Sequence, residues 1–220
     1  MCWNENISLN TFVFTTAVMI FIWYNNTYTQ YKLKEFTNWI TYCLFFSITV
    51  MQLIEYFLWK SINQKNKFDN TLFSIIGWIV IRIIQPLFII LIIPDKYSMM
   101  KKILFILYYS LLVLIHGYKY FYNPLDFTTT IDKNGHLLWK WLDLKNFELI
   151  IGYFYLFLFT TLLLSYPVIT LIFGAFFLYC YFNYYITWSS QWCWVCNSVF
   201  LYFLIKILFI MPYKEYKMLC

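Results

Sequence analysis

Charged residues are scarce in this sequence. Only 12% of its 220 residues are Asp, Glu, Lys or Arg, whereas 62% are hydrophobic and 25% are aromatic. A soluble domain usually has about 25% charged residues, so this chain cannot supply a charged surface for its size. The composition predicts an integral membrane protein whose main partner is the lipid bilayer. The formal charge of +6 comes mostly from lysines in predicted loops, which suits anionic lipid headgroups.

The sequence also lacks the motifs of common enzyme and nucleic-acid-binding classes. It has no Walker loop, no G-x-S-x-G and no H-E-x-x-H, and no nucleophile–base pair is visible. No basic stripe indicates a nucleic-acid partner. The first apolar run lacks a basic n-region and a small-residue cleavage site, so we expect a retained helix. These absences argue against an enzyme, and no cofactor is predicted.

The six cysteines show no disulfide framework. They are Cys2, Cys43, Cys180, Cys193, Cys196 and Cys220. Cys193 and Cys196 form a C-x-x-C, but no βαβ pattern surrounds them and four clear metal ligands are missing. We therefore expect no metal site and no redox role for this pair.

Seven apolar segments predict an all-α polytopic transmembrane bundle that forms a single membrane domain over residues 1–220. A bilayer core needs about 20 apolar residues in a helix, and backbone groups in lipid must be paired within the helix. The predicted spans are 7–24, 39–59, 72–93, 103–120, 149–165, 167–186 and 192–211. Pro94 and Pro212 are expected to close the third and seventh spans, and Pro167 to start the sixth. If the turn at Ser165–Pro167 is re-entrant, five or six spans remain.

One long extramembrane loop is predicted over residues 121–147. Asn134-Gly135 suits a type I′ hairpin turn. Trp139 and Trp141, which flank Lys140, suit a segment at the membrane interface. An irregular surface loop is the favoured interpretation, because the hairpin pattern is short.

Polar residues within the predicted spans indicate one site. We call the membrane face that carries the N-terminus face A and the opposite one face B. At about 1.5 Å per residue, the ionisable residues in the half nearer to face A are Glu55, Arg82 and His116. Gln52 precedes Glu55 by three residues and Gln85 follows Arg82 by three, so each amide shares a helix face with a charge. These five residues predict a polar intramembrane site in which Glu55 and Arg82 interact; a purely structural ion pair is the alternative.

Lys206 is predicted to lie apart from that site. It is about 8 Å from face B, where its long stem can reach headgroups or water, so we expect an interfacial lysine. A lysine in the last span also suggests a retinal Schiff base. Such a base needs a nearby anion, and the intramembrane carboxylate that the sequence offers, Glu55, is about 15 Å away along the bundle axis. A retinal lysine is therefore not expected.

The two ends of the chain share a C-W-x-x-N pattern, at Cys2-Trp3 and at Cys193-Trp194. The first and seventh spans run in the same direction, so both stretches are predicted on face A. Together with Trp192 they are expected to cap the polar site. Ordinary tryptophans of an interfacial belt are the alternative interpretation.

Membrane orientation is not predicted. The loop lysines divide evenly between the two faces, so the positive-inside rule favours neither. The glycosylation sequons at Asn6 and Asn25 lie on opposite faces, so both cannot be used.

Four stretches carry a resemblance to a known family: "MCWN...SLNTF" at 1–12, "MQLIEYFLW" at 51–59, "SYP" at 165–167 and "SSQWCWVCN" at 189–197. They resemble an uncharacterised family of multi-span membrane proteins from large DNA viruses of protists and from algae and other protists. The Trp-Cys-Trp and Gln-x-x-Glu motifs are its most specific parts, and Cys196 does not belong to the pattern. The resemblance implies a multi-pass protein of a host or virion membrane and implies no mechanism.

Transport or conduction of a small solute or ion is the leading functional hypothesis. A retinal-type photoreceptor and a non-enzymatic protein that organises membranes or binds partners are the alternatives. An intramembrane enzyme comes last. The oligomeric state is not predicted.

Overall fold

The computed structural model describes residues 4–93, 99–142 and 167–219, and they are almost entirely helical. Five helices are long and apolar enough to cross a membrane: Glu5–Tyr28, Trp39–Asn63, Lys67–Leu91, Lys102–Tyr122 and Trp188–Glu215. A sixth apolar helix, Val168–Asn183, is shorter. The predicted class, an all-helical bundle with several apolar spans, is therefore found. The count of seven is not confirmed, because residues 149–165 lie outside the described ranges.

The elements follow the chain in this order: α1 (Glu5–Tyr28), η1 (Lys34–Phe36), α2 (Trp39–Asn63), α3 (Lys67–Ile79), η2 (Val80–Ile84), α4 (Gln85–Leu91), α5 (Met99–Tyr122), β1 (Thr129–Ile131), β2 (Leu137–Trp139), α7 (Pro167–Asn183), α8 (Trp188–Cys196), α9 (Ser198–Ile205), η4 (Lys206–Ile210) and α10 (Met211–Leu219).

Asparagine side chains start the first three helices. Asn4, Asn38 and Asn66 each accept a hydrogen bond from a backbone N–H in the first turn that follows. Such caps satisfy backbone donors that have no partner inside the helix. Pro167, the predicted first residue of the sixth span, is the first described residue of α7.

Two π-helical turns, η2 and η4, interrupt the long helices, and a proline follows each of them after one residue. Gln85 N–H bonds to the carbonyl of Val80, and Met211 N–H bonds to that of Lys206, five residues back in both cases. The widened turn accommodates Pro86 and Pro212, which cannot continue a regular α-helix. The prediction that Pro212 closes the last span was wrong, because the helix continues beyond it as α10.

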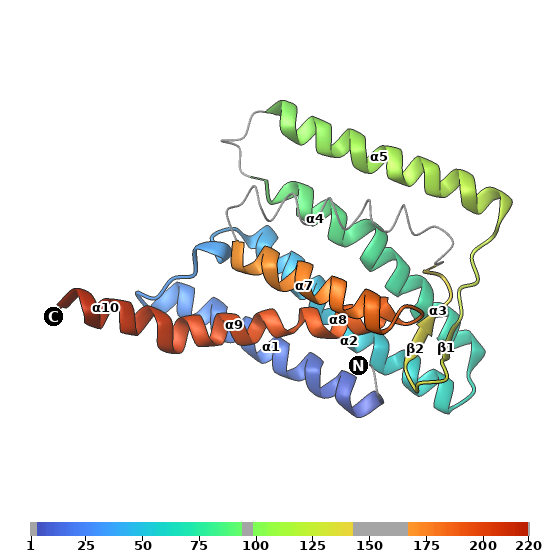
Figure 1. The fold of residues 1–220 in the computed structure, drawn as a ribbon, viewed down its shortest axis with the longest axis horizontal. Helices are drawn as coiled ribbons and strands as arrows, with labels where there is room; N and C mark the ends of the chain where they lie inside the picture. The colour runs from blue at the N-terminus through green and yellow to red at the C-terminus, as the bar shows by residue number, and fades with distance from the viewer. Residues whose placement is uncertain (1–3, 94–98, 143–166, 220) are drawn as a thin grey trace.

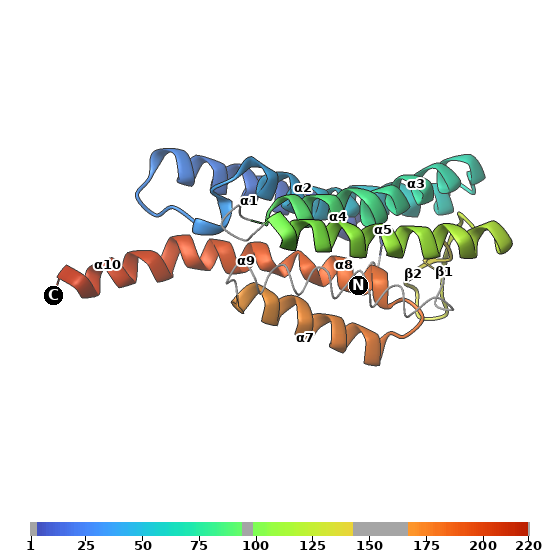
Figure 2. The ribbon, with the colours of Figure 1, turned by 90° about the horizontal axis from the view of Figure 1, so that it is seen from above.

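The helices form two layers, which Figure 2 shows one above the other. Helices α1 to α5 make one layer, and the second consists of α7 and the long α8–α9–η4–α10 helix. Helix α10 extends past the rest of the bundle, so that the C-terminus lies at one end of the molecule. The β1–β2 hairpin lies at the opposite end (Figure 1). By the order of the helices, the hairpin end corresponds to face A and the α10 end to face B.

The apolar core has two parts. Near face B, an aromatic cluster joins the α1–α2 connection to α2 and α9, with ring centroids of Phe36, Phe45 and Phe203 within 5.4 Å of one another. Near face A, buried residues of α2 and α8 pack on the hairpin and on Trp141. Helix α5 stands apart, since most of its apolar side chains are exposed.

The 121–147 loop contains a β-hairpin and is not irregular throughout. Thr129 pairs with Trp139 and Ile131 with Leu137. The prediction of a two-residue type I′ turn was wrong in detail. The connection between the strands spans five residues, and within it Gly135 alone has a positive φ, at 78°. The Asp132 carboxylate accepts from two backbone N–H groups in this turn, at 2.9 Å each.

Trp139 and Trp141 are buried inside the protein and do not form an exposed interfacial segment. Their exposed fractions are 2% and 0%, and the two rings stack with centroids 4.9 Å apart. Gly77 of α3 packs beside Trp141, and a Cβ there would lie 3.4 Å from the indole, an ordinary van der Waals contact. The hairpin is therefore an integral part of the core at face A.

Candidate functional site

The five residues predicted to form an intramembrane site divide into three groups. Arg82 and His116 line one cavity, and Gln85 lines another. Gln52 and Glu55 of α2 are fully buried and line neither cavity. A direct interaction between Glu55 and Arg82 stays a prediction.

The larger cavity lies between the α3–η2 segment and α5, and its volume is about 140 Å³. Arg82 and His116 are each only 5% exposed, which brings together two ionisable residues 34 positions apart. The remaining described lining residues are Trp78, Ile83, Val113, Gly117 and Tyr120. Sequence analysis placed Arg82 and His116 in the same half of the bundle but missed Trp78 and Tyr120, since aromatic residues are common at span ends.

The backbone carbonyl of Arg82 is hydrogen-bonded to α5, because Pro86 removes its helical donor. Pro86 has no N–H, so the carbonyl of Arg82, four residues earlier, loses its usual helical donor. The Tyr109 hydroxyl of α5 donates to that carbonyl at 3.0 Å. The π-helical turn and this hydrogen bond hold the Arg82 side of the cavity against α5.

A second, smaller cavity of about 30 Å³ lies where α2, α4, α7 and α8 meet. Gln85, Met51, Cys193 and Cys196 are among its lining residues. The Gln85 amide also donates a long hydrogen bond, 3.5 Å, to the carbonyl of Ser47. The volume is about that of one water molecule.

Three polar residues of α2 follow one another at a spacing of three: Thr49, Gln52 and Glu55. All three are fully buried. The Thr49 hydroxyl and both amide atoms of Gln52 have no hydrogen-bond partner among the described residues. Buried polar groups are seldom left this way in native proteins unless water or an ion satisfies them, so this face of α2 is a second polar region inside the bundle.

The predicted Cys-Trp cap over the polar site stays a prediction. Trp194 of α8 donates to the Thr11 hydroxyl of α1 at 3.1 Å, so the starts of the first and last spans do meet. Trp192 instead donates to the carbonyl of Phe173 in α7, and Cys193 is buried in the core. Cys2 and Trp3 lie outside the described residues.

The cysteines that the structure describes, Cys43, Cys180, Cys193 and Cys196, are free thiols. Within the described ranges, no three His, Cys, Asp or Glu side chains are placed to hold a metal ion.

Lys206, predicted to be an interfacial lysine, has a partner that the sequence analysis did not predict. Its ammonium forms a salt bridge with Glu35 in η1, the short helix that connects α1 to α2. The Glu35 side chain is 7% exposed and the Lys206 side chain is 23% exposed. The Lys206 ammonium also lies 5.6 Å from the centre of the Tyr202 ring. Sequence analysis missed Glu35 because this residue lies between the first two predicted spans. The flanking Leu33 and Phe36, both buried, were the signal that the connection folds back onto the bundle.

A second contact fastens the same connection to α10. The Glu215 carboxylate accepts from the Gln30 amide at 2.9 and 3.0 Å and from the Tyr31 hydroxyl at 2.6 Å. We call these contacts, with Glu35–Lys206, the face-B clasp. The clasp joins residues separated by 171 to 185 positions in the chain.

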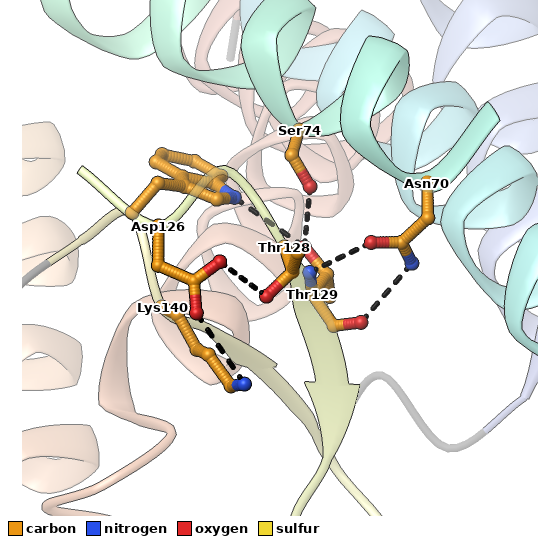
Figure 3. Close-up of polar contacts among 7 residues, drawn as sticks. Asn70, Ser74, Asp126, Thr128, Thr129 and Lys140 are labelled. Carbon is orange, nitrogen blue, oxygen red and sulfur yellow. Dashed lines mark hydrogen bonds and ion pairs between the residues drawn. The ribbon is translucent and has the colours of Figure 1, made fainter. Parts of the chain in front are cut away.

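At face A, neutral hydrogen bonds hold the buried part of the hairpin, while the Lys140–Asp126 ion pair beside them is exposed (Figure 3). The Asn70 amide of α3 accepts from the Thr129 N–H at 2.9 Å and donates to its carbonyl at 3.0 Å. The Thr129 hydroxyl is 2.8 Å from that of Ser74 and accepts from the Trp141 indole at 3.3 Å. Ser190 of α8 donates to the Leu137 carbonyl on the other strand. We call this set the face-A plug.

The fold makes the glycosylation sequon at Asn25 inaccessible. Asn25 is 2% exposed and its amide donates to the Tyr31 carbonyl, so its nitrogen is not available for modification. Asn6, in the first turn of α1, is exposed.

Comparison with known proteins gives no name or function. No protein-family model, no curated protein and no solved structure matches this chain. The resemblance to a viral and protist membrane family remains a prediction.

Proposed function

We propose that this protein is a multi-pass membrane protein that transports a small solute or ion, and that the solute occupies the cavity between η2 and α5. The observation that supports this proposal is the convergence of two almost fully buried ionisable residues, Arg82 and His116, on a cavity of about 140 Å³. A charge inside a membrane helix costs about 2.5–3.5 kcal/mol on insertion scales. Ionisable groups that face a bundle interior commonly mark a pathway or a ligand site.

The buried polar face of α2 gives further support. Gln52 and Thr49 have hydrogen-bonding atoms that no described residue satisfies, and Glu55 follows on the same face. A solute path needs polar groups along the bundle axis as well as at one binding site. The seven-span count predicted from the sequence remains part of this proposal.

Osmotic recovery of proteoliposomes tests the proposal. Vesicles with purified protein are shrunk in potassium chloride, potassium gluconate or glycerol, and the rate of re-swelling is measured by stopped-flow light scattering. We expect faster re-swelling than in empty vesicles for at least one solute, and loss of most of that increase in Arg82→Gln. Lys60→Gln, which removes an exposed cation from α2, is the control and should keep the increase. No difference from empty vesicles with any solute would refute transport of these classes.

A retinal-type photoreceptor remains a second candidate, because one argument against it no longer holds. The structure places the Glu35 carboxylate beside Lys206, so a counterion for a Schiff base exists. However, Lys206 lines neither of the two cavities described above, and a chromophore needs room beside the lysine. We therefore rank this function below transport.

A further inference from the structure

Three helix segments that pack together each contribute buried polar atoms without a hydrogen-bond partner. Helix α1 contacts α2 and α9, and α2 contacts α8. Atoms of this kind are the Thr16 hydroxyl in α1, the Thr49 hydroxyl and both amide atoms of Gln52 in α2, and Oδ1 of Asn197 between α8 and α9. Thr49, Gln52 and Asn197 are at most 4% exposed. Native proteins seldom leave such groups unsatisfied unless water or an ion binds there.

A hydrogen bond between α1 and α2 fixes the relative depth of their polar groups. Asn63 near the end of α2 donates to the Glu5 carboxylate at the start of α1, at 3.2 Å. Gln52 precedes Asn63 by eleven residues, and Thr16 follows Glu5 by eleven. Because the two helices run in opposite directions, Gln52 and Thr16 both lie about 16 Å from that hydrogen bond. They are therefore at the same level of the bundle.

A second hydrogen bond places Asn197 at this level too. Trp194 of α8 donates to the Thr11 hydroxyl of α1 at 3.1 Å, and both helices run from face A towards face B. Asn197 follows Trp194 by three residues, about 4.5 Å along the axis. Thr16 follows Thr11 by five residues, about 7.5 Å. The polar groups of the three segments thus lie within about 3 Å of one depth.

We propose that these groups bind a sodium ion where α1, α2 and the α8–α9 junction meet. The ligands would be the amide oxygens of Gln52 and Asn197 and the hydroxyls of Thr49 and Thr16. Oxygen atoms of this kind are the ligands that hard cations take. This site is separate from the cavity between η2 and α5, so the inference goes beyond the proposed function and stands whether or not a solute is transported.

The neutral character of the ligands favours a monovalent ion over a divalent one. Protein sites for calcium combine carbonyl oxygens with carboxylates, and in the described parts of the chain no three His, Cys, Asp or Glu side chains are placed to hold a metal ion. Glu55, the next polar residue on this side of α2, takes part in another interaction and is not required as a ligand. Neutral oxygens alone can replace the hydration shell of a monovalent cation inside a membrane protein.

The two amides are suited to present oxygen to a cation. The Asn197 amide nitrogen donates to the carbonyl of Cys193 at 2.9 Å, which identifies Oδ1 as the atom left to accept. The Gln52 amide can turn its oxygen towards the ion, because neither of its polar atoms is held by a hydrogen bond. The cavity of about 30 Å³ that Met51, Cys193 and Cys196 line borders the same α2–α8 contact and leaves room for this adjustment.

The test measures cation-dependent thermal stability of the purified full chain in detergent. The unfolding midpoint is recorded as sodium chloride replaces choline chloride at constant ionic strength, and again with potassium chloride in place of sodium chloride. A ligand that binds the folded state raises the midpoint with its concentration. We expect sodium to raise the midpoint above its value in choline, and to act at lower concentration than potassium.

Two variants locate the binding site. Gln52→Leu keeps the approximate shape of the side chain and should abolish the sodium-specific shift, whereas Gln64→Leu, at the exposed end of α2, should keep it. Thr49→Val removes only a hydroxyl and should raise the sodium concentration needed by about tenfold, as loss of one contact to a charge predicts. Thr27→Val, at an exposed position of α1, is its control.

The outcomes separate the ion site from transport. A sodium-specific shift that is lost in Gln52→Leu supports the site even if proteoliposomes show no flux, in which case transport alone fails. Equal midpoints in sodium, potassium and choline would overturn the inference, because water would then satisfy these polar groups, and transport would still stand. A shift of equal size in the parent protein and in both Gln52→Leu and Thr49→Val would also overturn it, because sodium would then bind elsewhere.

Discussion

The two ends of this bundle are closed in different ways. At face A, the plug inserts a β-hairpin between helices and satisfies its backbone with the neutral side chains of Asn70 and Ser190. At face B, the clasp uses carboxylates, with Glu35 bound to Lys206 and Glu215 bound to Gln30 and Tyr31. Neutral groups lose less hydration free energy on burial than charges do. This difference explains why the fully buried plug is neutral, while charges occur where Lys206 and Glu215 retain some exposure.

The largest effect is expected at the plug. Asn70→Ala would leave the N–H and carbonyl of Thr129 without their partner inside the core, which should lower the free energy of unfolding by about 2–5 kcal/mol. Asn63→Ala is the matched control, since Asn63 is exposed and bonds only to the side chain of Glu5. Denaturant unfolding in detergent, followed by tryptophan fluorescence, measures both variants. Equal stabilities of the two would show that the hairpin contributes little to the fold.

A smaller effect is expected at the clasp. Glu35→Gln leaves Lys206 without its counterion, and because Lys206 is partly exposed we expect a loss of about 2 kcal/mol, less than for a fully buried pair. Lys206→Gln should cost a similar amount, and the double variant should cost less than the sum. The same unfolding assay completes this double-mutant cycle. Additive losses would mean that the two side chains do not stabilise each other, and the contrast between the two ends would disappear.

The smallest effect is expected from pH, at the hairpin turn. Burial lowers the pKa of His136 in the hairpin turn, although the nearby Asp132 opposes this. Below about pH 6.5, the unfolded chain therefore binds a proton at His136 more readily than the folded chain does. The free energy of unfolding should then fall as the pH drops from 6.5 towards the lower pKa of the folded state. Unfolding midpoints of the parent protein and of His136→Gln, measured from pH 7.5 to 5, test this. An unchanged pH slope in the variant would exclude His136 as the cause.

Local features of the sequence predicted the helices well. Composition indicated the membrane class, and the apolar runs placed the start of α2 at Trp39. Arg82 and His116, which were predicted at similar depth, do line one cavity, whereas the site itself stays a prediction. The prediction was incomplete for Gln85, which lies in a different cavity, because equal depth does not specify which side of a helix faces which neighbour.

The errors came from proline and from connections. Pro212 was expected to end a helix, but the helix continues past it because the π-helical turn η4 accommodates the proline. Trp139 and Trp141 were assigned to the interface, but the hairpin buries them. In each case the local preference was real, and packing against distant residues overrode it.

By itself, the sequence determined that this chain forms apolar helices of membrane-spanning length, because hydropathy and helical periodicity are properties of short segments. It also determined that few charges would lie within them. Only the tertiary structure decided the surroundings of those charges. Lys206 pairs with Glu35, 171 positions away, and Arg82 lines a cavity with His116 and Trp78. The physical reason is that a buried charge is paired by polar or charged side chains of whichever element packs beside it. That choice depends on how helices and loops pack together, which no local pattern of residues encodes.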